Sequence, residues 1–452
     1  MSDTNRKDNK SAVKHVVIVG AGFAGLYCAK ALASVANVRV TLLDRNNYQQ
    51  FQPLLYQVAT ASLAPNRAAF NLRSVLRRQL NVDVRMTDII SIDLLGKTVT
   101  GRNGDTYSGD YLVLAAGSQA NYFSVTGVEE FAFPMYSLRD AERLRSRLIE
   151  VFEAADTEIA RDTSAVLHLA VIGGGPTGVE MAGAVADICH SAPKKLYKSL
   201  RLQDVVITLI NGKDEVLSGF TQRSKAYAKR SLEKRGVKVR LNSQVKELTS
   251  REILLGDETR IPCSLAIWAG GLKAAPLAGA INLAHGQGGR IDVEPDLSLL
   301  SYPCIYAVGD FANIGDGGGK MLPQLASVAQ QAGRHCARNI AAHTNGAPTS
   351  AFAYFDKGIL AMIGRNAGIA EIGPRRITLT GFIAFIAWLG VHALLLTTIP
   401  AKMGACFEWV WNYFGGVNVE GILDSPSQSG IGTSSTRNVP KIHPETQAAD
   451  LK

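Results

Sequence analysis

Closely spaced cysteine pairs are absent from this chain of 452 residues. Its six cysteines, at positions 28, 189, 263, 304, 336 and 406, are widely scattered, and no two have CxxC or CxxxxC spacing. That spacing favours neither a zinc site nor a dithiol redox pair. We therefore expect the cysteines to be reduced thiols, most of them buried as small hydrophobic side chains. We expect no metal site.

Aromatic residues are scarce among the basic ones. The formal net charge is +9, a balance that suits nucleic acid or an anionic membrane surface. Basic runs such as 73–78, however, are short, mixed with apolar residues and poor in aromatics, which is typical of solvated helix faces. We therefore expect no nucleic-acid partner.

The two ends of the chain lack apolar runs. Residues 1–13 have no apolar core of the kind found in signal peptides, so we expect the body of the protein to stay in the cytoplasm. Residues 425–452 are rich in Ser, Thr, Gly, Pro and Gln. Both ends are predicted to be disordered tails.

Between the tails, the pattern predicts an α/β fold. Residues 15–19 form a continuous apolar, β-branched run, as expected for a parallel strand buried on both faces. A glycine-rich turn, an Ala/Leu-rich helical stretch over 26–36 and a second strand over 38–43 follow. The same order recurs between 166 and 210. Two βαβ units of this kind predict two Rossmann-like dinucleotide-binding domains.

The first turn carries Gly20, Gly22 and Gly25 in a G-x-G-x-x-G pattern. The first glycine permits the tight turn, the second lets the backbone approach a pyrophosphate, and the third packs the helix close to the sheet. Asp44 ends the next strand, where a carboxylate accepts hydrogen bonds from ribose hydroxyls. The unit is therefore predicted to bind a dinucleotide.

The second turn repeats the pattern with Gly173, Gly175 and Gly178. A chain needs two such units when one holds a flavin and the other docks a nicotinamide opposite it. The strand-end position here is Asn211, and an amide bonds a ribose hydroxyl without repelling a 2′-phosphate. Lys213 is near enough in sequence to contact such a phosphate or to be a solvated loop lysine. The sequence therefore leaves both NADH and NADPH as candidate hydride donors.

A third glycine turn, Gly309-Asp310, follows a buried apolar run. In a flavin domain, an aspartate here can hydrogen-bond the ribityl chain. The alternative is a turn-forming aspartate with no ligand.

These segments resemble the type II NADH:quinone oxidoreductases, a family of flavoproteins with two dinucleotide-binding domains. The resemblance runs from about residue 14 to residue 418, and it is most specific over 44–59, 173–180, 307–310 and 363–367. It implies that the first unit binds FAD, the second binds NADH, and electrons pass to a quinone. The cofactor contacts that follow, from the resemblance and the turns, are Gly20, Gly22, Phe23, Ala24, Gly25, Asp44, Ala116, Gly117, Gly173, Gly175, Pro176, Thr177, Gly178, Asn211, Gly270, Gly309 and Asp310.

The resemblance also implies two catalytic residues. Glu180 matches a family glutamate placed near nicotinamide and flavin, although an acid in the first turn of a helix is favoured by the helix dipole alone. The family's quinone signature, Ala-Gln-x-Ala-x-Gln, aligns with 326–331, where Ser327 replaces the first glutamine and Gln331 keeps the second. The family commonly has Glu at the position of Asn211, which weakens the choice of NADH over NADPH.

Residues 377–401 contain no Lys, Arg, Asp or Glu. Their length and apolarity suit a single spanning helix, with Arg375, Arg376 and Lys402 at its ends. The family reading, which we favour, is two helices lying in the membrane interface on the cytoplasmic face of the inner membrane. Because His392 is the only titratable residue within the stretch, we expect no proton pumping through it. The apolar surface would come from Phe382, Phe385, Ile386, Trp388, Leu389, Leu394, Leu395, Trp409, Trp411 and Tyr413.

The sequence thus predicts an FAD-binding domain of residues 14–125 and 286–350, an NAD(P)H-binding domain of residues 126–285 and a membrane-association region of residues 351–424. A homodimer through the C-terminal helices is left open. So are three other activities: a reductase of a soluble electron carrier, a sulfide:quinone oxidoreductase, and a dinucleotide sensor without enzymatic activity. The sulfide enzyme would need cysteines at the flavin, and Cys263 and Cys304 have no motif spacing.

Overall fold

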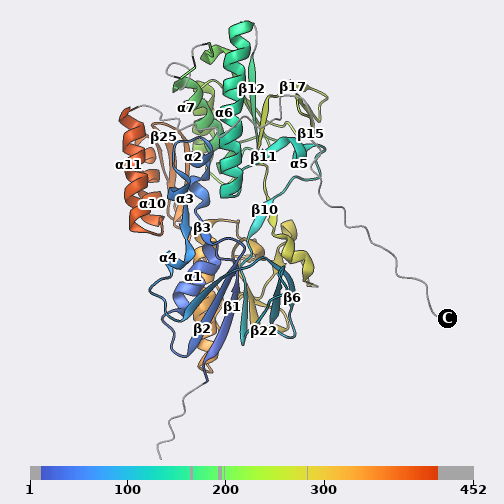
Figure 1. Cartoon of the computed structure of the whole chain (residues 1–452), viewed down its shortest axis with the longest axis vertical. Helices are drawn as coiled ribbons and strands as arrows, with labels where there is room; N and C mark the ends of the chain where they lie inside the picture. Colours follow the sequence, from blue (N-terminus) through green and yellow to red (C-terminus); the bar gives the residue numbers. More distant parts are fainter. Residues whose placement is uncertain (1–11, 163–165, 192–195, 198, 282, 416–452) are drawn as a thin grey trace, which may run out of the picture.

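The computed structural model describes residues 12–162, 166–191, 196–197, 199–281 and 283–415. The predicted tails lie outside these residues, apart from positions 12 and 13. Two parallel sheets form two lobes, and the C-terminal helices lie along one side (Figure 1).

The first sheet has the order β21-β22-β9-β1-β2-β5, and all its neighbours are parallel except β21 and β22. The apolar run of β1 is almost fully buried, as expected for a strand covered on both faces. Helix α1 (Phe23–Leu32) connects β1 to β2. The strands are β1 (Lys14–Val19), β2 (Val38–Asp44), β5 (Val82–Met86), β9 (Tyr111–Leu114), β21 (Ser298–Leu299) and β22 (Tyr302–Ala307).

The second sheet repeats this plan with the order β11-β18-β12-β13-β14, all parallel. The predicted α/β class with two Rossmann-like units is therefore confirmed, while the exact domain bounds stay a prediction. The strands are β11 (Ala132–Pro134), β12 (Leu167–Ile172), β13 (Val205–Ile210), β14 (Val237–Arg240) and β18 (Leu265–Trp268). The helices are α6 (Leu138–Arg161), α7 (Pro176–Ser191) and α8 (Gln222–Lys234).

Short elements complete the two lobes. Strand β10 (Ser118–Ala120) pairs with β19 (Leu272–Ala274), so the chain crosses between the lobes on a two-stranded ladder. The remaining strands are β3 (Tyr48–Gln50), β4 (Ala69–Asn71), β6 (Ile89–Asp93), β7 (Thr98–Gly101), β8 (Thr106–Ser108), β15 (Val245–Leu248), β16 (Glu252–Leu255), β17 (Arg260–Pro262), β20 (Ile291–Asp292) and β23 (Ala312–Asn313). The short helices are α2 (Leu55–Ala59), α3 (Pro65–Ala68), α4 (Leu72–Val75) and α5 (Val128–Phe131).

The C-terminal region contains a strand where a helix was expected. Residues 377–381 form β26 (Ile377–Gly381), which pairs with β25 (Ala367–Ile372), itself paired with β24 (Gly358–Gly364). Two helices follow, α10 (Phe382–Leu395) and α11 (Ile399–Gly415). Gly381 precedes α10 with a φ of +77°, and Pro400 lies at the start of α11, so the apolar stretch is broken at both ends of α10.

The alternative of a single spanning helix over 377–401 is therefore wrong. At about 1.5 Å per residue, the 14 residues of α10 extend for about 21 Å, which is less than the hydrocarbon core of a bilayer. Within the described residues, no helix combines the length and apolarity needed to cross a membrane.

Helix α11 is held against the first lobe by polar contacts. Glu408 accepts hydrogen bonds from the backbone N–H of Ala64 at 2.9 Å and from Nε of Arg67 at 2.7 Å. Trp409 Nε1 donates to Oε1 of the buried Gln57 at 2.7 Å. These bonds fix which face of α11 points outward.

Helix α9 (Ala326–Thr344) packs closely on α1, with Gly333 against the backbone of Ala24. A Cβ on Gly333 would lie 2.1 Å from the carbonyl oxygen of Ala24. We expect Gly333→Ala to lower the free energy of unfolding by about 1–3 kcal/mol, because the two helices would have to separate. Thermal unfolding followed by circular dichroism measures this.

Gly390→Ala is the matched control, because nothing lies within 4 Å of a Cβ at that helical position. It should stabilise the protein by about 0.5–1 kcal/mol, since alanine is the better helix former. Equal melting temperatures for the two variants would show that the α1–α9 contact is not tight.

Candidate functional site

A cavity of about 1100 Å³ runs through the protein from the first glycine-rich turn to helix α10. Its wall takes residues from both lobes and from the C-terminal region. Gly22 and Asp44 lie on it from the first lobe, Thr177 and Glu180 from the second, and His392 from α10.

The first turn is fixed by close backbone contacts. A Cβ on Gly25 would lie 1.8 Å from the carbonyl oxygen of Gly20, so the helix can approach the turn only without a side chain there. Gly22 has open space where a Cβ would be, and it faces the cavity. Asp44 accepts hydrogen bonds at 2.7 Å from the backbone N–H groups of Ala21 and Asn46, and burial raises the pKa of its carboxyl.

The second turn has the same construction. A Cβ on Gly178 would lie 1.9 Å from the carbonyl oxygen of Gly173, and Gly175 is open to the cavity. Asn211 stands where Asp44 stands in the first unit: its Oδ1 accepts from the N–H of Gly174 at 3.1 Å. Its Nδ2 donates to the carbonyl of Glu215 at 2.8 Å. In this structure the amide of Asn211 therefore braces the turn and does not line the cavity.

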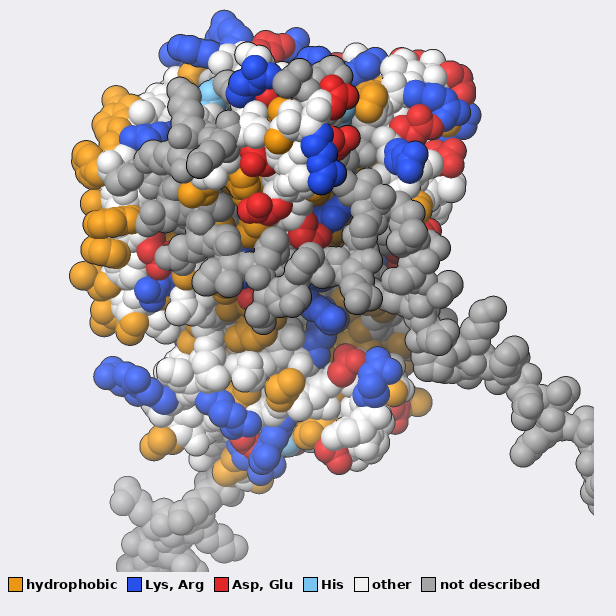
Figure 2. Space-filling model, turned by 45° about the horizontal axis from the view of Figure 1, so that its top comes forward, with side chains coloured by type: hydrophobic (Ala, Val, Ile, Leu, Met, Phe, Trp, Pro, Cys, Tyr) orange, Lys and Arg blue, Asp and Glu red, His pale blue; other side chains and the backbone are white. Residues whose placement is uncertain are grey.

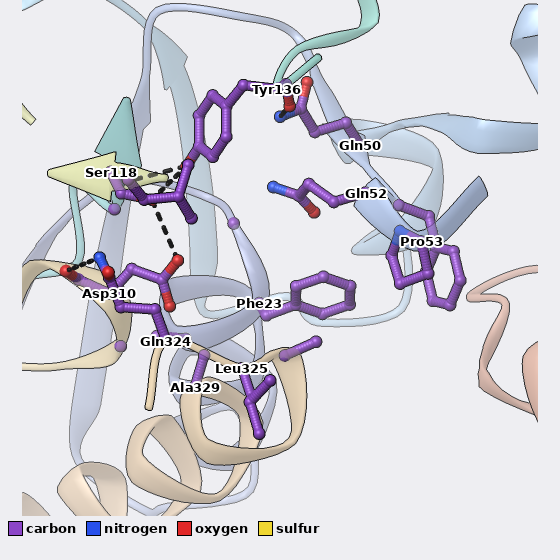
Figure 3. Close-up of a pocket in the computed structure, with 18 of the residues that line it drawn as sticks. Phe23, Gln50, Gln52, Pro53, Ser118, Tyr136, Asp310, Gln324, Leu325 and Ala329 are labelled. Carbon is purple, nitrogen blue, oxygen red and sulfur yellow. Dashed lines mark hydrogen bonds between the residues drawn. The ribbon is translucent and has the colours of Figure 1, made fainter. Parts of the chain in front are cut away.

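Asp310 lies at the centre of a hydrogen-bonded chain on the cavity wall (Figure 3). Ser118 Oγ donates to Oδ2 of Asp310 at 3.0 Å, and Tyr136 Oη lies 2.9 Å from Ser118 Oγ. Tyr136 Oη also accepts a hydrogen bond from the backbone N–H of Ser118 at 3.2 Å. Burial raises the pKa values of Asp310 and Tyr136. Tyr136 follows β11 of the second sheet, so the chain joins the two lobes.

Glu180 is a buried carboxyl on helix α7. Its Oε1 accepts from the backbone N–H of Met362 at 3.2 Å, and the indole of Trp388 also hydrogen-bonds to it. Burial outweighs both contacts and raises the pKa of Glu180 to about 8. The carboxyl is therefore mostly protonated at neutral pH and can give up a proton within the cavity.

The predicted quinone motif lies at the start of α9, on the cavity wall. Its polar side chains are tied to the segment before β24: Ser327 Oγ lies 2.9 Å from Tyr354 Oη. The amide of Gln331 donates to the backbone oxygen of Phe355 and accepts from its N–H, both at 3.0 Å. The side-chain amide of Gln331 keeps one free N–H on Nε2 and one free lone pair on Oε1.

Helix α10 turns some predicted surface residues inward. Trp388 is fully buried and Phe385 nearly so, and only part of the predicted apolar surface, including Phe382 and Leu394, is exposed. The prediction that Trp388 and Phe385 supply an outer surface is therefore wrong. The reason is that β24 and β25 pack under α10 and cover that face.

The predicted cofactor residues divide between the cavity wall and the layer behind it. Those on the wall are Gly20, Gly22, Phe23, Ala24, Asp44, Ala116, Gly117, Gly175, Pro176, Thr177, Gly309 and Asp310. Gly25, Gly173 and Gly178 lie behind the wall and permit the close helix packing. Asn211 also lies behind the wall, where it braces its turn. Gly270 is also behind the wall, where a Cβ would meet the ring of Trp268.

The sequence did not indicate Ser118, Tyr136 or Gln324, whose Nε2 donates to the backbone oxygen of Asp310 at 3.2 Å. None of the three belongs to a spaced motif. A serine directly after the predicted strand end at Gly117 was the one signal available.

The cavity wall contains no cysteine among the described residues. Cys263 is buried, and burial raises the pKa of its thiol to about 12. No cluster of potential metal ligands occurs in the part of the chain that the structure describes.

The residues present fit an FAD. The open face of Gly22 lets a pyrophosphate approach the backbone at the N-terminus of α1. The half-buried carboxyl groups of Asp44 and Asp310 both lie on the wall, and each keeps lone pairs for hydroxyl groups.

Comparisons with known proteins agree with this geometry. Residues 14–333 match the family model described as pyridine nucleotide-disulphide oxidoreductase. A type II NADH:quinone oxidoreductase of Mycobacterium tuberculosis is 34% identical over 417 residues, covering 88% of this chain and 87% of that protein.

Two solved structures share the fold. The NDH2 of Plasmodium falciparum in complex with NADH has a TM-score of 0.80 at 20% identity, covering 90% of this chain and 99% of that one. The sulfide:quinone oxidoreductase of Aquifex aeolicus has a TM-score of 0.70 at 18% identity, covering 92% and 100%. At these identities, the likeness establishes the fold alone.

The raised pKa of Glu180 predicts a pH-dependent stability. The carboxyl titrates near its ordinary value of 4.5 in the unfolded chain and near about 8 in the folded protein. Between these values the folded protein binds the extra proton, so stability falls as the pH rises through this window. We expect Glu180→Gln to raise the melting temperature slightly at about pH 5 and most at about pH 8 and above.

Glu130→Gln, at an exposed position of α5, is the control and should shift the melting temperature little at any pH. A gain for Glu180→Gln that is the same at every pH would mean that the carboxyl does not titrate as its burial requires.

Proposed function

The chain belongs to the type II NADH:quinone oxidoreductases, within the pyridine nucleotide-disulphide oxidoreductase family, and we propose that its large cavity is where both half-reactions occur. The protein is an FAD-dependent enzyme that oxidises NADH and reduces a quinone. The observation that carries the proposal is the continuity of the cavity: a single space joins the first glycine turn, the second glycine turn and helix α10.

The binding roles follow from the position of each group. The backbone around Gly22 holds the FAD pyrophosphate, Asp44 the ribose and Asp310 the ribityl hydroxyls. Gly175 to Thr177 open the second unit to the NADH pyrophosphate in the same way. The bound flavin supplies the hydride and electron transfer chemistry, and the protein contributes positioning and exclusion of water.

Glu180 holds a proton next to the reacting groups. Reduction of a quinone to a quinol takes up two electrons and two protons, and the protonated Glu180 carboxyl is a proton donor within the cavity. Gln331 lies on the wall at the α9 end, and its remaining N–H can donate to a quinone carbonyl. Ser327 contributes to holding the Tyr354–Phe355 segment that supports Gln331.

The nucleotide preference is open to NADPH. No carboxylate stands at the end of β13, because that position is Asn211 and its amide is directed to Gly174 and Glu215. A 2′-phosphate would therefore meet no repelling strand-end acid. We propose that NADPH serves as a slower second donor.

An apolar outer surface supports attachment to a membrane. Hydrophobic side chains gather along the edge where α10 and α11 lie (Figure 2). This surface is defined by the exposed residues Phe382, Ile383, Ile386, Val391, Leu394, Leu395, Ile399, Met403, Phe407, Val410, Trp411 and Phe414. We propose that it lies in the interface of the inner membrane, on the cytoplasmic side, without proton pumping. A homodimer through the same helices would cover part of it.

The two half-reactions are separable by anaerobic mixing of the purified, detergent-solubilised protein with NADH and then with a short-chain quinone. We expect bleaching of the flavin absorbance by NADH and its recovery on addition of quinone. NADPH should bleach it more slowly.

Bleaching without recovery would contradict quinone as the acceptor and favour a reductase of a soluble electron carrier. Failure of both nucleotides to bleach the flavin would contradict the assignment of the donor.

Membrane attachment is testable by flotation with vesicles of phosphatidylcholine and phosphatidylglycerol. We expect the double variant Ile383→Glu, Phe407→Glu to bind at least about ten-fold more weakly, because two exposed apolar anchors are replaced by charges. Its rate of flavin bleaching by NADH should be unchanged.

The matched control is Leu95→Glu, Leu300→Glu, which changes two exposed leucines at strand turns of the first lobe. Equal flotation of the two double variants would contradict attachment through α10 and α11.

A further inference from the structure

Helix α10 has two faces with different surroundings. Ile383, Ile386 and Leu394 are exposed on the outer face, whereas Trp388 and His392 are buried on the inner one. His392 reaches the cavity wall together with Ala387, Val391 and Leu395. His392 is the single titratable side chain of α10, and it has no part in the proposed binding of FAD, NADH or the quinone.

The hydrogen bond of His392 fixes its tautomer. Nδ1 lies 2.8 Å from the backbone oxygen of Trp388. A carbonyl oxygen only accepts, so Nδ1 carries the proton. The imidazole is stacked on the Trp388 ring, with centroids 3.8 Å apart and an interplanar angle of 21°, and Phe51 meets it edge to face at 6.1 Å. The ring is thereby held in one orientation.

The other nitrogen, Nε2, is a hydrogen-bond acceptor. Burial lowers the pKa of His392 to about 4, so the ring is neutral at neutral pH, and with the proton on Nδ1 the lone pair is on Nε2. Among the described residues, none donates to Nε2. Nε2 is not one of the fully buried polar side-chain atoms left without a partner, and the His392 side chain lies on the cavity wall. The cavity therefore presents a neutral acceptor at its α10 end.

An acceptor distinguishes the two redox states of the substrate. A quinone offers only carbonyl oxygens, which cannot donate a hydrogen bond to Nε2. Two-electron reduction with uptake of two protons converts both carbonyls to hydroxyls, and a hydroxyl donates. Resting on the function proposed above, we propose that His392 is a specificity-determining contact for the quinol product: its Nε2 accepts a hydrogen bond from a quinol hydroxyl and makes none with the quinone.

The test compares product and substrate binding in the FAD-loaded enzyme in detergent, with decylubiquinone as substrate and decylubiquinol as inhibitor. We expect His392→Phe, which keeps an aromatic ring on Trp388, to raise the inhibition constant of the quinol about ten-fold, as for the loss of a buried hydrogen bond. The KM for decylubiquinone should change less than about two-fold, because no bond to it is lost.

His392→Gln places an amide oxygen near the position of Nε2 and should restore much of the quinol inhibition. His392→Leu is a second variant without an acceptor, for use if the phenylalanine variant does not retain FAD. His190→Phe is the matched control: His190 makes the same bond, from Nδ1 to the backbone oxygen four residues earlier, but on the exposed end of α7 and away from the cavity.

Parallel changes in the inhibition constant and the KM would overturn the proposal, since His392 would then only shape the cavity. An unchanged inhibition constant would overturn it as well. These results are distinct from a failure of the proposed function, which would appear as absence of quinone reduction by the unmodified enzyme.

Discussion

The structure depends on the close approach of a helix N-terminus to a strand end, made twice. In each unit the third glycine of the turn packs against the carbonyl oxygen of the first, Gly25 on Gly20 and Gly178 on Gly173. This contact is possible only without a Cβ, and it brings the backbone N–H groups at the start of α1 and α7 to the cavity. The positions of Asp44, Glu180 and the cavity itself follow from it.

A consequence of this arrangement is that three carboxyl groups are desolvated on the cavity wall. Asp44, Asp310 and Glu180 all have raised pKa values because desolvation outweighs their hydrogen bonds. Desolvated titratable groups with raised pKa values are typical of ligand-binding and proton-transfer sites. Glu180 differs from the other two in the source of its hydrogen bonds, which come from Met362 of β24 and Trp388 of α10.

Helix α10 connects the cavity to the outer surface. Its inner face supplies the Trp388 indole to Glu180 and the His392 ring to the cavity, and its outer face is part of the apolar surface. Helix α11 is bound to α2 through Trp409 and Gln57, and the same α2 contributes Leu55 and Tyr56 to the wall. Helix α10 therefore contributes side chains both to the apolar outer surface and to the cavity wall.

The sequence by itself determined the α/β class and the two dinucleotide units, because their signals are local: in each unit the buried apolar strands, the glycine spacing and the strand-end polar residue belong to one βαβ segment. The residues Gly22, Asp44 and Asp310, which the sequence singled out as cofactor contacts, line the cavity. Only the tertiary structure decided that Asn211 braces its own turn, that Gln331 holds Phe355, and that residues 377–401 divide into β26, α10 and the start of α11. These outcomes, like the inward turn of Trp388 and His392 and the contact of Ser118 with Asp310, depend on which segments pack together in the fold, and no local pattern of apolar or polar residues specifies which partner covers which face.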